Sequence, residues 1–345
     1  MQSLSRSLRT LPLIPVLLAI AAIQANAESM EELYAKAKQE NTLVFYGAGP
    51  TGAHDRWVNE FQQRFPGVKV ELTGGLSPVL SKRVDEQLAQ RVVQVDLASF
   101  QTIQDFARWK QVGAMLLFKP EGFDKIDPAY KDEDGAYTPI SINLITYAYN
   151  IKRVAAADIP KSALDFLKPL YKGELVTTDP TADDAALAIF NMVIGKYGWE
   201  YMDRYMAQQP TFVTTGHQTV SRMIADGEKL TSFDSTSSTP VMKAEGKPIE
   251  PLISQQDDTP VFLVGSGILK DAPHPNAAKL YLTWYMAREQ QSRTGTFSPR
   301  SDVSPPGGLQ PLTAYKIDSG YRKLVSDEAH LIELRRRFAT YVHKR

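Results

Sequence analysis

The stretch from Asn41 to Arg83 constrains the fold of this chain more than any other segment. Thr42–Tyr46 is a short apolar run with β-branched and aromatic residues, which predicts a buried strand. A glycine-rich turn follows, and apolar residues at helical spacing then continue to Pro66-Gly67, where the helix is expected to end. Val68–Leu72 alternates as a second strand, and a second glycine turn opens another helix. Two strand-to-helix turns in succession predict a βαβ unit, and open α/β sheets bind ligands at the carboxyl ends of such strands.

The polar turns at these strand ends supply the candidate ligand-binding residues of the first half. Glycine lets the backbone turn sharply and brings bare amides close to a ligand above the strand. A third strand, expected after Val92–Leu97, leads into a further polar turn. The candidates from these three turns are Gly47, Ala48, Gly49, Thr51, Gly75, Ser77, Phe100 and Gln101.

The second half repeats the order of strand, polar turn and helix. Ile140–Tyr149 is a long β-rich run that is well placed to cross between two lobes, and Val261–Ile268 is a second run that could return the chain. The aspartates of 179–184 are explained first as helix caps, worth ~0.3–1 kcal/mol each, and contact with a ligand stays an open alternative. The candidates from this half are Asn143, Thr181, Asp183, Thr215, His217, Asp234 and Ser235.

Length and composition indicate a two-lobed globular protein. The 345 residues exceed one average domain, and 43% hydrophobic with 23% charged residues is ordinary globular material. Cysteine is absent, which excludes thiol nucleophiles, disulfides and cysteine-based zinc sites and suits an oxidising compartment.

The N-terminus predicts a secretory signal peptide over residues 1–27. Arg6 and Arg9 precede the mostly apolar run Leu11–Ile23, and Ala25-Asn26-Ala27 forms a small-x-small cleavage site. The apolar run is well short of the ~20 residues that span a bilayer, which disfavours an uncleaved anchor. We therefore expect cleavage after Ala27 and a mature chain that is not embedded in a membrane.

The charge of the mature chain argues against a polyanionic partner. Without Arg6 and Arg9 the chain keeps 37 basic and 39 acidic residues, a net charge of −2. This balance offers no basic field for nucleic acid, so we expect none as a partner.

Motifs for catalysis, metals and cofactors are missing from the sequence. It contains no Gly-x-Ser-x-Gly elbow, His-Glu-x-x-His motif or Walker loop, and the glycines at 47, 49 and 52 do not complete a dinucleotide fingerprint. Asp132–Gly135 lacks the spacing of an EF-hand. We predict no catalytic residues, no metal site and no cofactor, and the sequence disfavours an enzyme.

Two further groups of charged residues are interpreted as surface. Five histidines are scattered without ligand spacing; His54 and His274 are predicted to be exposed, and only His217 is kept as a ligand contact. The cluster Arg335–Arg337 is predicted to lie on a solvated helix face.

The segments that match a known family are LVFYGAG, FQQRFPGVKVEL followed by TGG, VDLASF, TYAYN, PKSALDFLKPLYKGEL, GSGILKDAPHPNAAKLYLTWYMAREQQ and SPRSDVSPPGG. With them the chain resembles the extracellular solute-binding proteins of ABC importers, type II class, which includes ferric-iron, thiamine and phosphonate binders. The matches cover nearly all of residues 40–308 in the family's order. The resemblance implies an α/β fold with two lobes, each a mixed sheet flanked by helices, joined by two hinge strands. It also implies a monomeric periplasmic receptor that closes on a small solute and delivers it to a membrane permease. The expected division is 28–143 with 259–305 for lobe 1, 144–258 for lobe 2, and C-terminal helices over 306–345.

The ferric-iron branch of this family usually binds the ion with paired tyrosines, an acidic residue and often a histidine. The segment that matches the tyrosine pair is Ser232–Thr236, Gly47–Thr51 has no histidine, and Gln101 stands at the acidic position. The resemblance therefore disfavours bare ferric ion. Our hypothesis is a small polar organic solute, zwitterionic or anionic, such as a phosphonate or an amine-bearing acid. Its anionic end would face the amides of Gly74–Ser77, and its amine end the aspartates of lobe 2.

Three alternatives remain open at this point. The first is a ferric-iron protein with non-standard ligands or a bound anion. The second is a periplasmic ligand sensor for a membrane kinase, and the third is a secreted enzyme on the same scaffold.

Overall fold

The computed structural model describes residues 28–235, 238–306, 309–318 and 320–343. The predicted signal peptide lies outside the described residues. Within them, no helix combines the length and the apolar character that crossing a membrane requires.

The opening βαβ prediction is confirmed. Strand β1 (Thr42–Ala48) pairs in parallel with β2 (Lys69–Gly75), and on its other side with β3 (Leu97–Phe100). The carboxyl ends of the three strands therefore lie at one edge of the sheet, next to the predicted polar turns. The helices and the short strand of this lobe are α1 (Met30–Glu40), η1 (Thr51–His54), α2 (Asp55–Arg64), α3 (Ser77–Gln90), α4 (Ile103–Gln111), β4 (Met115–Leu116), η2 (Phe123–Lys125), α9 (Pro275–Met286) and α10 (Arg288–Gln291).

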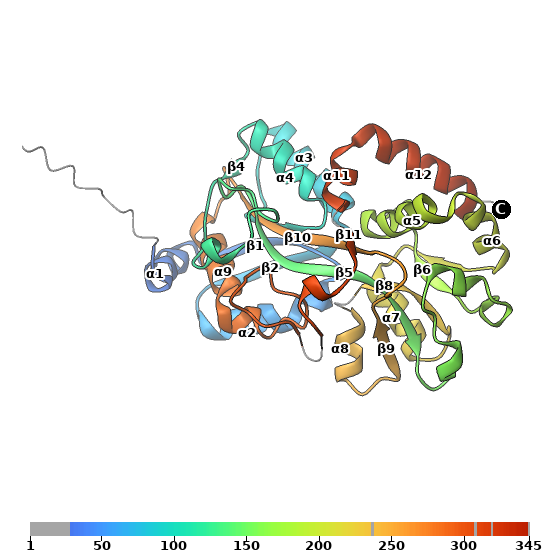
Figure 1. The fold of residues 1–345 in the computed structure, drawn as a ribbon. Coiled ribbons are helices and arrows are strands. Elements are labelled where there is room, and N and C mark those ends of the chain that lie inside the picture. The colour runs from blue at the N-terminus through green and yellow to red at the C-terminus, as the bar shows by residue number, and fades with distance from the viewer. Residues whose placement is uncertain (1–27, 236–237, 307–308, 319, 344–345) are drawn as a thin grey trace, which may run out of the picture.

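Two long strands cross between the lobes, as the β-rich runs predict. They are β5 (Thr138–Asn150) and β10 (Thr259–Leu269), and they pair antiparallel with a register shift between Val264 and Gly265. The sheet order β2-β1-β3-β10-β5-β8 runs through both lobes, and the two strands lie at its centre (Figure 1).

The second lobe is assembled on the far end of β5. Its strands are β6 (Val176–Thr178), β7 (Thr211–Val213), β8 (Thr231–Ser235) and β9 (Ile249–Leu252). Strands β8 and β9 pair with β5, whereas β6 and β7 form a parallel pair of their own. The helices are η3 (Ala156–Asp158), η4 (Ala163–Leu167), η5 (Pro169–Tyr171), α5 (Asp184–Tyr197), α6 (Glu200–Ala207), α7 (His217–Ala225) and α8 (Ser238–Ala244).

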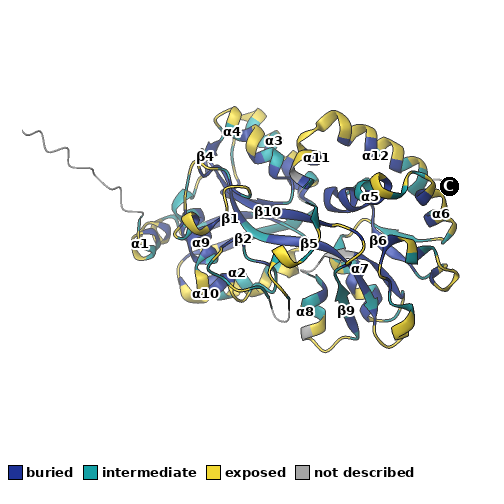
Figure 2. Ribbon diagram, in the orientation of Figure 1, coloured by how far each residue is buried: buried dark blue, intermediate teal, exposed yellow. Residues whose placement is uncertain are grey.

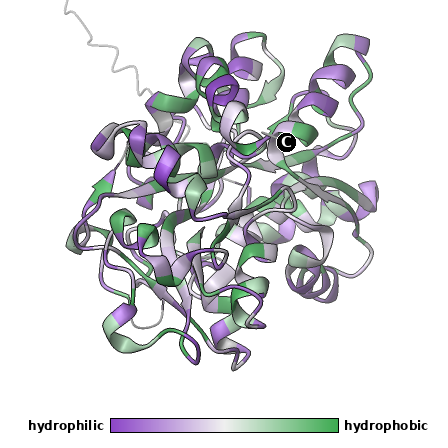
Figure 3. Cartoon of the chain, turned by 90° about the vertical axis from the view of Figure 1, so that its right-hand side faces the viewer, coloured by the Kyte–Doolittle hydropathy of each residue, from purple (hydrophilic) through white to green (hydrophobic). Residues whose placement is uncertain are grey.

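Each lobe has its own aromatic core. In the first, Phe61 packs against Phe65, Tyr281 and Trp284. In the second, Phe190 contacts Tyr205 and Phe233 beneath the crossing strands. Burying one such side chain contributes about 1.5–3 kcal/mol. Figure 2 shows the central strands buried and the outer helices exposed on one face, and Figure 3 shows hydrophilic and hydrophobic stretches alternating along the helices, as packing on a sheet requires.

The C-terminal segment packs along both lobes. After η6 (Leu312–Ala314) and the two-residue strand β11 (Ile317–Asp318), helices α11 (Tyr321–Ser326) and α12 (Glu328–Val342) finish the described chain. In Figure 1, α11 lies between α4 and α5, and it contacts both helices and β10. Helix α12 packs on the second lobe, where Phe338 contacts Phe190 and Trp199.

Candidate functional site

The first two predicted turns are joined by hydrogen bonds. The Gly49 amide donates to the Gly75 carbonyl at 2.8 Å, and the Gly74 amide donates to Thr51 Oγ1 at 3.1 Å. A β-carbon at Gly74 would lie 2.4 Å from the Thr51 backbone nitrogen, so only glycine fits there. The turns that carry Gly47, Ala48, Gly49, Thr51 and Gly75 are thus held as one rigid surface.

His54 lies beneath this surface, and the prediction that it is exposed is wrong. Its Nε2 donates to the Ala48 carbonyl at 2.9 Å, and its ring occupies the space beside Gly47. Burial lowers the pKa of His54 below its ordinary value, because the imidazolium would lose its hydration. The neutral ring supports the first turn from below.

The third turn meets the start of α3. Ser77 Oγ accepts from the Gln101 amide at 3.0 Å, which ties the second turn to the third. The Gln101 Oε1 atom is buried and has no hydrogen-bond partner among the described residues. Phe100 is fully buried in the first core against Phe106, so its side chain is unavailable to a ligand, and only its backbone lies at the turn.

In the second lobe, Asp183 caps α5 and also faces a histidine. Its Oδ1 accepts from the Ala186 amide at 2.8 Å and lies 3.4 Å from His217 Nε2. The His217 ring lies over Phe262 of β10, and its Nδ1 is 3.4 Å from Thr178 Oγ1. Burial alone would raise the pKa of Asp183, but the charge and hydrogen bond of His217 outweigh it and lower that pKa. Asp183 is therefore the predicted helix cap and also forms a polar contact with His217.

The pKa of the neighbouring Asp184 shifts in the opposite direction, and Asp184 has a partner that the sequence did not predict. Burial raises its pKa, with Arg335 opposing and Asp183 adding to the rise. The Arg335 guanidinium forms an ion pair with Asp184, which is 2% exposed, so the predicted solvated face for Arg335 is wrong. Gln104 Nε2 reaches the other carboxylate oxygen from α4 at 3.4 Å. Two adjacent aspartates at a helix start require a counter-charge, and that signal could have pointed to the arginine cluster.

The remaining candidates are placed as follows. Asn143 is buried on β5; its Nδ2 donates to Ser141 Oγ at 2.9 Å, and its Oδ1 is buried without a partner among the described residues. Thr181 Oγ1 donates to Asp179 and lies 3.1 Å from His343 Nε2. Thr215 Oγ1 donates to Thr219 on the exposed surface. Asp234 and Ser235 end β8 opposite Thr146 and Ile145, and their side chains lie outside the described part of the structure.

The structure thus joins Ser77 to Gln101 in the first lobe and Asp183 to His217 in the second, and Gln104 links the two sides through Asp184. Over the described ranges, no group of three or more His, Asp and Glu side chains is arranged to hold a metal ion.

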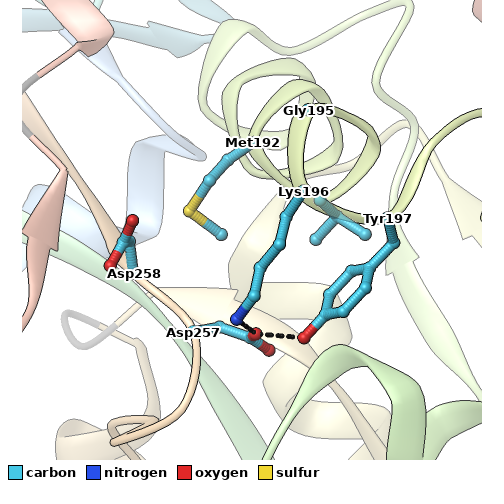
Figure 4. A pocket seen from close by; sticks show the side chains of 7 residues that line it. Met192, Gly195, Lys196, Tyr197, Asp257 and Asp258 are labelled. Carbon is cyan, nitrogen blue, oxygen red and sulfur yellow. Dashed lines mark hydrogen bonds and ion pairs between the residues drawn. The ribbon is translucent and has the colours of Figure 1, made fainter.

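A cavity of about 270 Å³ lies elsewhere, at the carboxyl end of α5. Figure 4 shows Lys196 and Tyr197 pointing toward Asp257 at its edge. The Asp257 carboxylate accepts from both and also from Tyr147 and the Ala163 amide, so it has a full set of partners. The cavity belongs to the frame of the second lobe and not to the predicted strand ends.

The prediction that His274 is exposed is also wrong. Its Nδ1 lies 2.9 Å from Asp96 Oδ2, and Asp96 is fully buried and also accepts from the Val44 amide. This pair anchors the start of α9 to β1, far from the turns.

Comparisons with known proteins agree with this architecture. A probable ABC transporter periplasmic-binding protein of Sinorhizobium fredii is 22% identical over 265 residues, 71% of this chain and 69% of that protein. An Fe(3+)-binding periplasmic protein of Serratia marcescens is 26% identical over 157 residues, which is 44% of each chain. The alignment thus covers less than half of the Serratia protein.

A solved structure shares the fold over nearly its whole length. The periplasmic binding protein AfuA of Actinobacillus pleuropneumoniae, with fructose-6-phosphate bound, superposes with a TM-score of 0.74 at 18% identity. The match covers 88% of this chain and 99% of that one. The predicted two-lobed type II fold is confirmed by this likeness.

A match to a protein family covers most of the chain. The family described as bacterial extracellular solute-binding protein matches residues 56–308, which include most of both lobes and both crossing strands. The chain belongs to the bacterial extracellular solute-binding proteins.

Proposed function

We propose that the chain is the receptor of an ABC importer for a small polar organic solute that carries hydrogen-bond donors and an anionic group. Membership of its family makes it a binding protein and not an enzyme. The observation that carries the proposal is a set of three buried amide oxygens without partners in the described chain, on Gln101, Gln104 and Asn143. A buried, unpaired carbonyl costs about 1–3 kcal/mol, and a ligand hydroxyl or ammonium group would remove that cost.

The two lobes offer different charges to such a solute. Helix α3 begins without a side-chain cap, so its first amides favour an anionic group. Helix α5 is already capped by the Asp183 carboxylate, whose lowered pKa keeps it charged. The anionic end of the solute is therefore assigned to the start of α3 in lobe 1, its hydroxyl donors to the three amide oxygens, which also belong to lobe 1, and an amine end to Asp183 in lobe 2.

Similar proteins support an anionic, oxygen-rich solute. AfuA is described with fructose-6-phosphate, a ligand that combines an anion with several hydroxyl donors. The Serratia relative is named for ferric iron. The segment that matches the paired tyrosines of the iron branch, Ser232–Thr236, contains no tyrosine, which favours the organic solute for this chain.

Capture and delivery follow from the two-lobed fold. Residues 28–143 with 259–305 form lobe 1 in this proposal, 144–258 form lobe 2, and 306–345 pack on both. A micromolar ligand that contacts both lobes contributes ~8 kcal/mol, more than the few kcal/mol that separate open and closed forms. The closed monomer would then be recognised in the periplasm by a permease, after cleavage behind Ala27.

Titration calorimetry on purified residues 28–345 tests the proposal. The probes are fructose-6-phosphate, 2-aminoethylphosphonate, ethanolamine, a simple carboxylate, ferric citrate and ferric ion. We expect saturable heat with at least one organic solute and none with ferric ion alone. Heat from ferric ion only would reject the organic-solute proposal and favour the iron alternative.

The sensor alternative predicts the same binding and differs in the partner. Pull-down of detergent-solubilised membranes with the closed form separates a permease from a membrane kinase. Recovery of a kinase without any permease would contradict the importer assignment.

A further inference from the structure

Two long hydrogen bonds lie beside the candidate site, one between the lobes and one between the C-terminal segment and the first lobe. Gln104 Nε2 of α4 donates to Asp184 Oδ2 of α5 at 3.4 Å. Tyr321 of α11 donates its hydroxyl to the Gln101 carbonyl at 3.3 Å. Since Gln104 follows the end of β3 and Asp184 follows the end of β6, the first bond forms only while the two strand ends lie close together. The second bond ties the C-terminal helix α11 to the third turn of the first lobe.

Arg335 of α12 fixes the central member of this contact. Its Nη2 pairs with Asp184 Oδ1, and the carboxylate is almost wholly buried. A buried carboxylate needs a partner, because its loss of hydration is otherwise uncompensated. The guanidinium therefore holds Asp184 in the orientation that leaves Oδ2 facing Gln104.

Some hydrogen-bonding atoms at this contact have no partner in the described part of the chain, which is expected of a contact that breaks when the lobes open. Arg335 Nε and Gln104 Oε1 are both buried without a partner among the described residues. Buried polar atoms that lack partners favour separation, since water would satisfy them in the open form. The bonds that hold the lobes together and the atoms that oppose them are on the same side chains.

We propose that Gln104, Asp184, Tyr321 and Arg335 form an interlobe latch, in which the C-terminal helices set the balance between the open and closed receptor. The proposal rests on the proposed function, because it concerns closure of the same site. Arg335 acts as a positioning residue through Asp184, and Gln104 makes the contact across the lobes. Hydrogen bonds to a charged group are worth about 1.5–3 kcal/mol, so losing one changes the ratio of closed to open forms about tenfold or more.

The chain contains no cysteine, so pairs of spin labels can be introduced without background. Labels at Gln63→Cys on α2 and Arg222→Cys on α7 occupy exposed positions on the two lobes. Double electron–electron resonance spectroscopy without any added solute then measures the distance between the two labels and so between the lobes. Because no ligand is used, this measurement does not depend on the outcome of the calorimetry.

We expect Gln104→Ala, Asp184→Asn and Arg335→Gln each to raise the proportion of long distances about tenfold relative to short ones. Arg336→Gln is the matched control: the same helix carries Arg336, whose partner Glu333 is exposed, and its distances should equal those of the parent. Thermal unfolding reports whether each variant is folded. If Asp184→Asn does not fold, the distances in Gln104→Ala decide whether the latch exists. Distances that stay unchanged or shorten in folded Gln104→Ala would overturn the latch, whatever solute the receptor binds.

Discussion

The carboxylate of Asp257 accepts a 2.5 Å hydrogen bond from the hydroxyl of Tyr147, which projects from the crossing strand β5. Burial and the neighbouring carboxylate raise the pKa of Tyr147 far above its ordinary value, so the hydroxyl keeps its proton and donates. The same carboxylate binds Lys196 at the end of α5. One side chain thus connects a hinge strand to the main helix of the second lobe.

Replacement of this carboxylate should destabilise the protein strongly. Asp257→Asn keeps the shape but puts an amide donor against Tyr147, Tyr197 and Lys196, which are donors themselves. We expect a loss of about 3 kcal/mol in the free energy of unfolding, measured by urea denaturation. Asp258→Asn is the control, since that neighbouring side chain is exposed, and it should stay within about 0.5 kcal/mol of the parent. Equal destabilisation by both changes would contradict the assigned role.

The same group predicts a pH dependence. Burial alone would raise the pKa of Asp257, but hydrogen bonds from Lys196, Tyr147 and Tyr197 outweigh it and lower that pKa below its ordinary value. A carboxyl whose pKa is lower in the folded state stabilises the fold above its unfolded pKa, and this contribution is lost as the pH falls through the folded value. The difference in unfolding free energy between the parent and Asp257→Asn should therefore be constant from pH 7 to pH 5 and shrink below about pH 4. A difference that grows on acidification would show that the carboxylate is not the stabilising form.

The glycine turns give a prediction about sterics. Gly74→Ala places a methyl group 2.4 Å from the Thr51 nitrogen and 2.7 Å from the Gly49 carbonyl, and backbone cannot rotate away. We expect a cost of about 1–3 kcal/mol in unfolding free energy and a loss of solute binding, because the joined turns must separate. Gly52→Ala, whose nearest neighbour is the Asp55 carboxylate at 3.7 Å, should leave both unchanged. Calorimetry and urea denaturation of the two variants provide the comparison.

Replacement of Asn143 tests whether this buried side chain serves solute binding or the stability of the fold. Asn143→Leu removes a buried amide whose oxygen has no partner among the described residues, so stability should be unchanged or slightly higher. If the oxygen accepts from the solute, affinity should fall by at least about tenfold. Thr138→Val is the control, because Thr138 Oγ1 is also buried without a partner there but belongs to the first residue of β5, whereas Asn143 lies in the middle of that strand. Full affinity in Asn143→Leu would remove this residue from the site.

The fold was accessible from local patterns because its elements are local. The alternation of Val68–Leu72 and the apolar run of Thr42–Tyr46 each specify a strand, and their parallel pairing follows from the helix between them. The two long β-rich runs likewise predicted β5 and β10. Signals within about 30 residues were sufficient for these conclusions.

The site was less accessible, since its contacts join distant segments. Arg335 and Asp184 are 151 residues apart, and no local pattern at either position indicates the other. Predictions of exposure for His54 and His274 failed for the same reason, because the Ala48 carbonyl and the Asp96 carboxylate that bind them are set by the packing of turns and helices. Phe100 was assigned by its position in a polar turn, whereas the strand pleat directs its ring into the core.

The place of β10 between β3 and β5 has a consequence for how the chain is made. Strands β1–β3 lack their central neighbour until residues beyond 259 have been synthesised, whereas β5–β9 lie within one continuous segment. A chain that emerges N-terminus first can therefore finish its later lobe before its earlier one. During that interval one edge of β3 is unpaired, and such an edge can pair with a strand of another chain and cause aggregation.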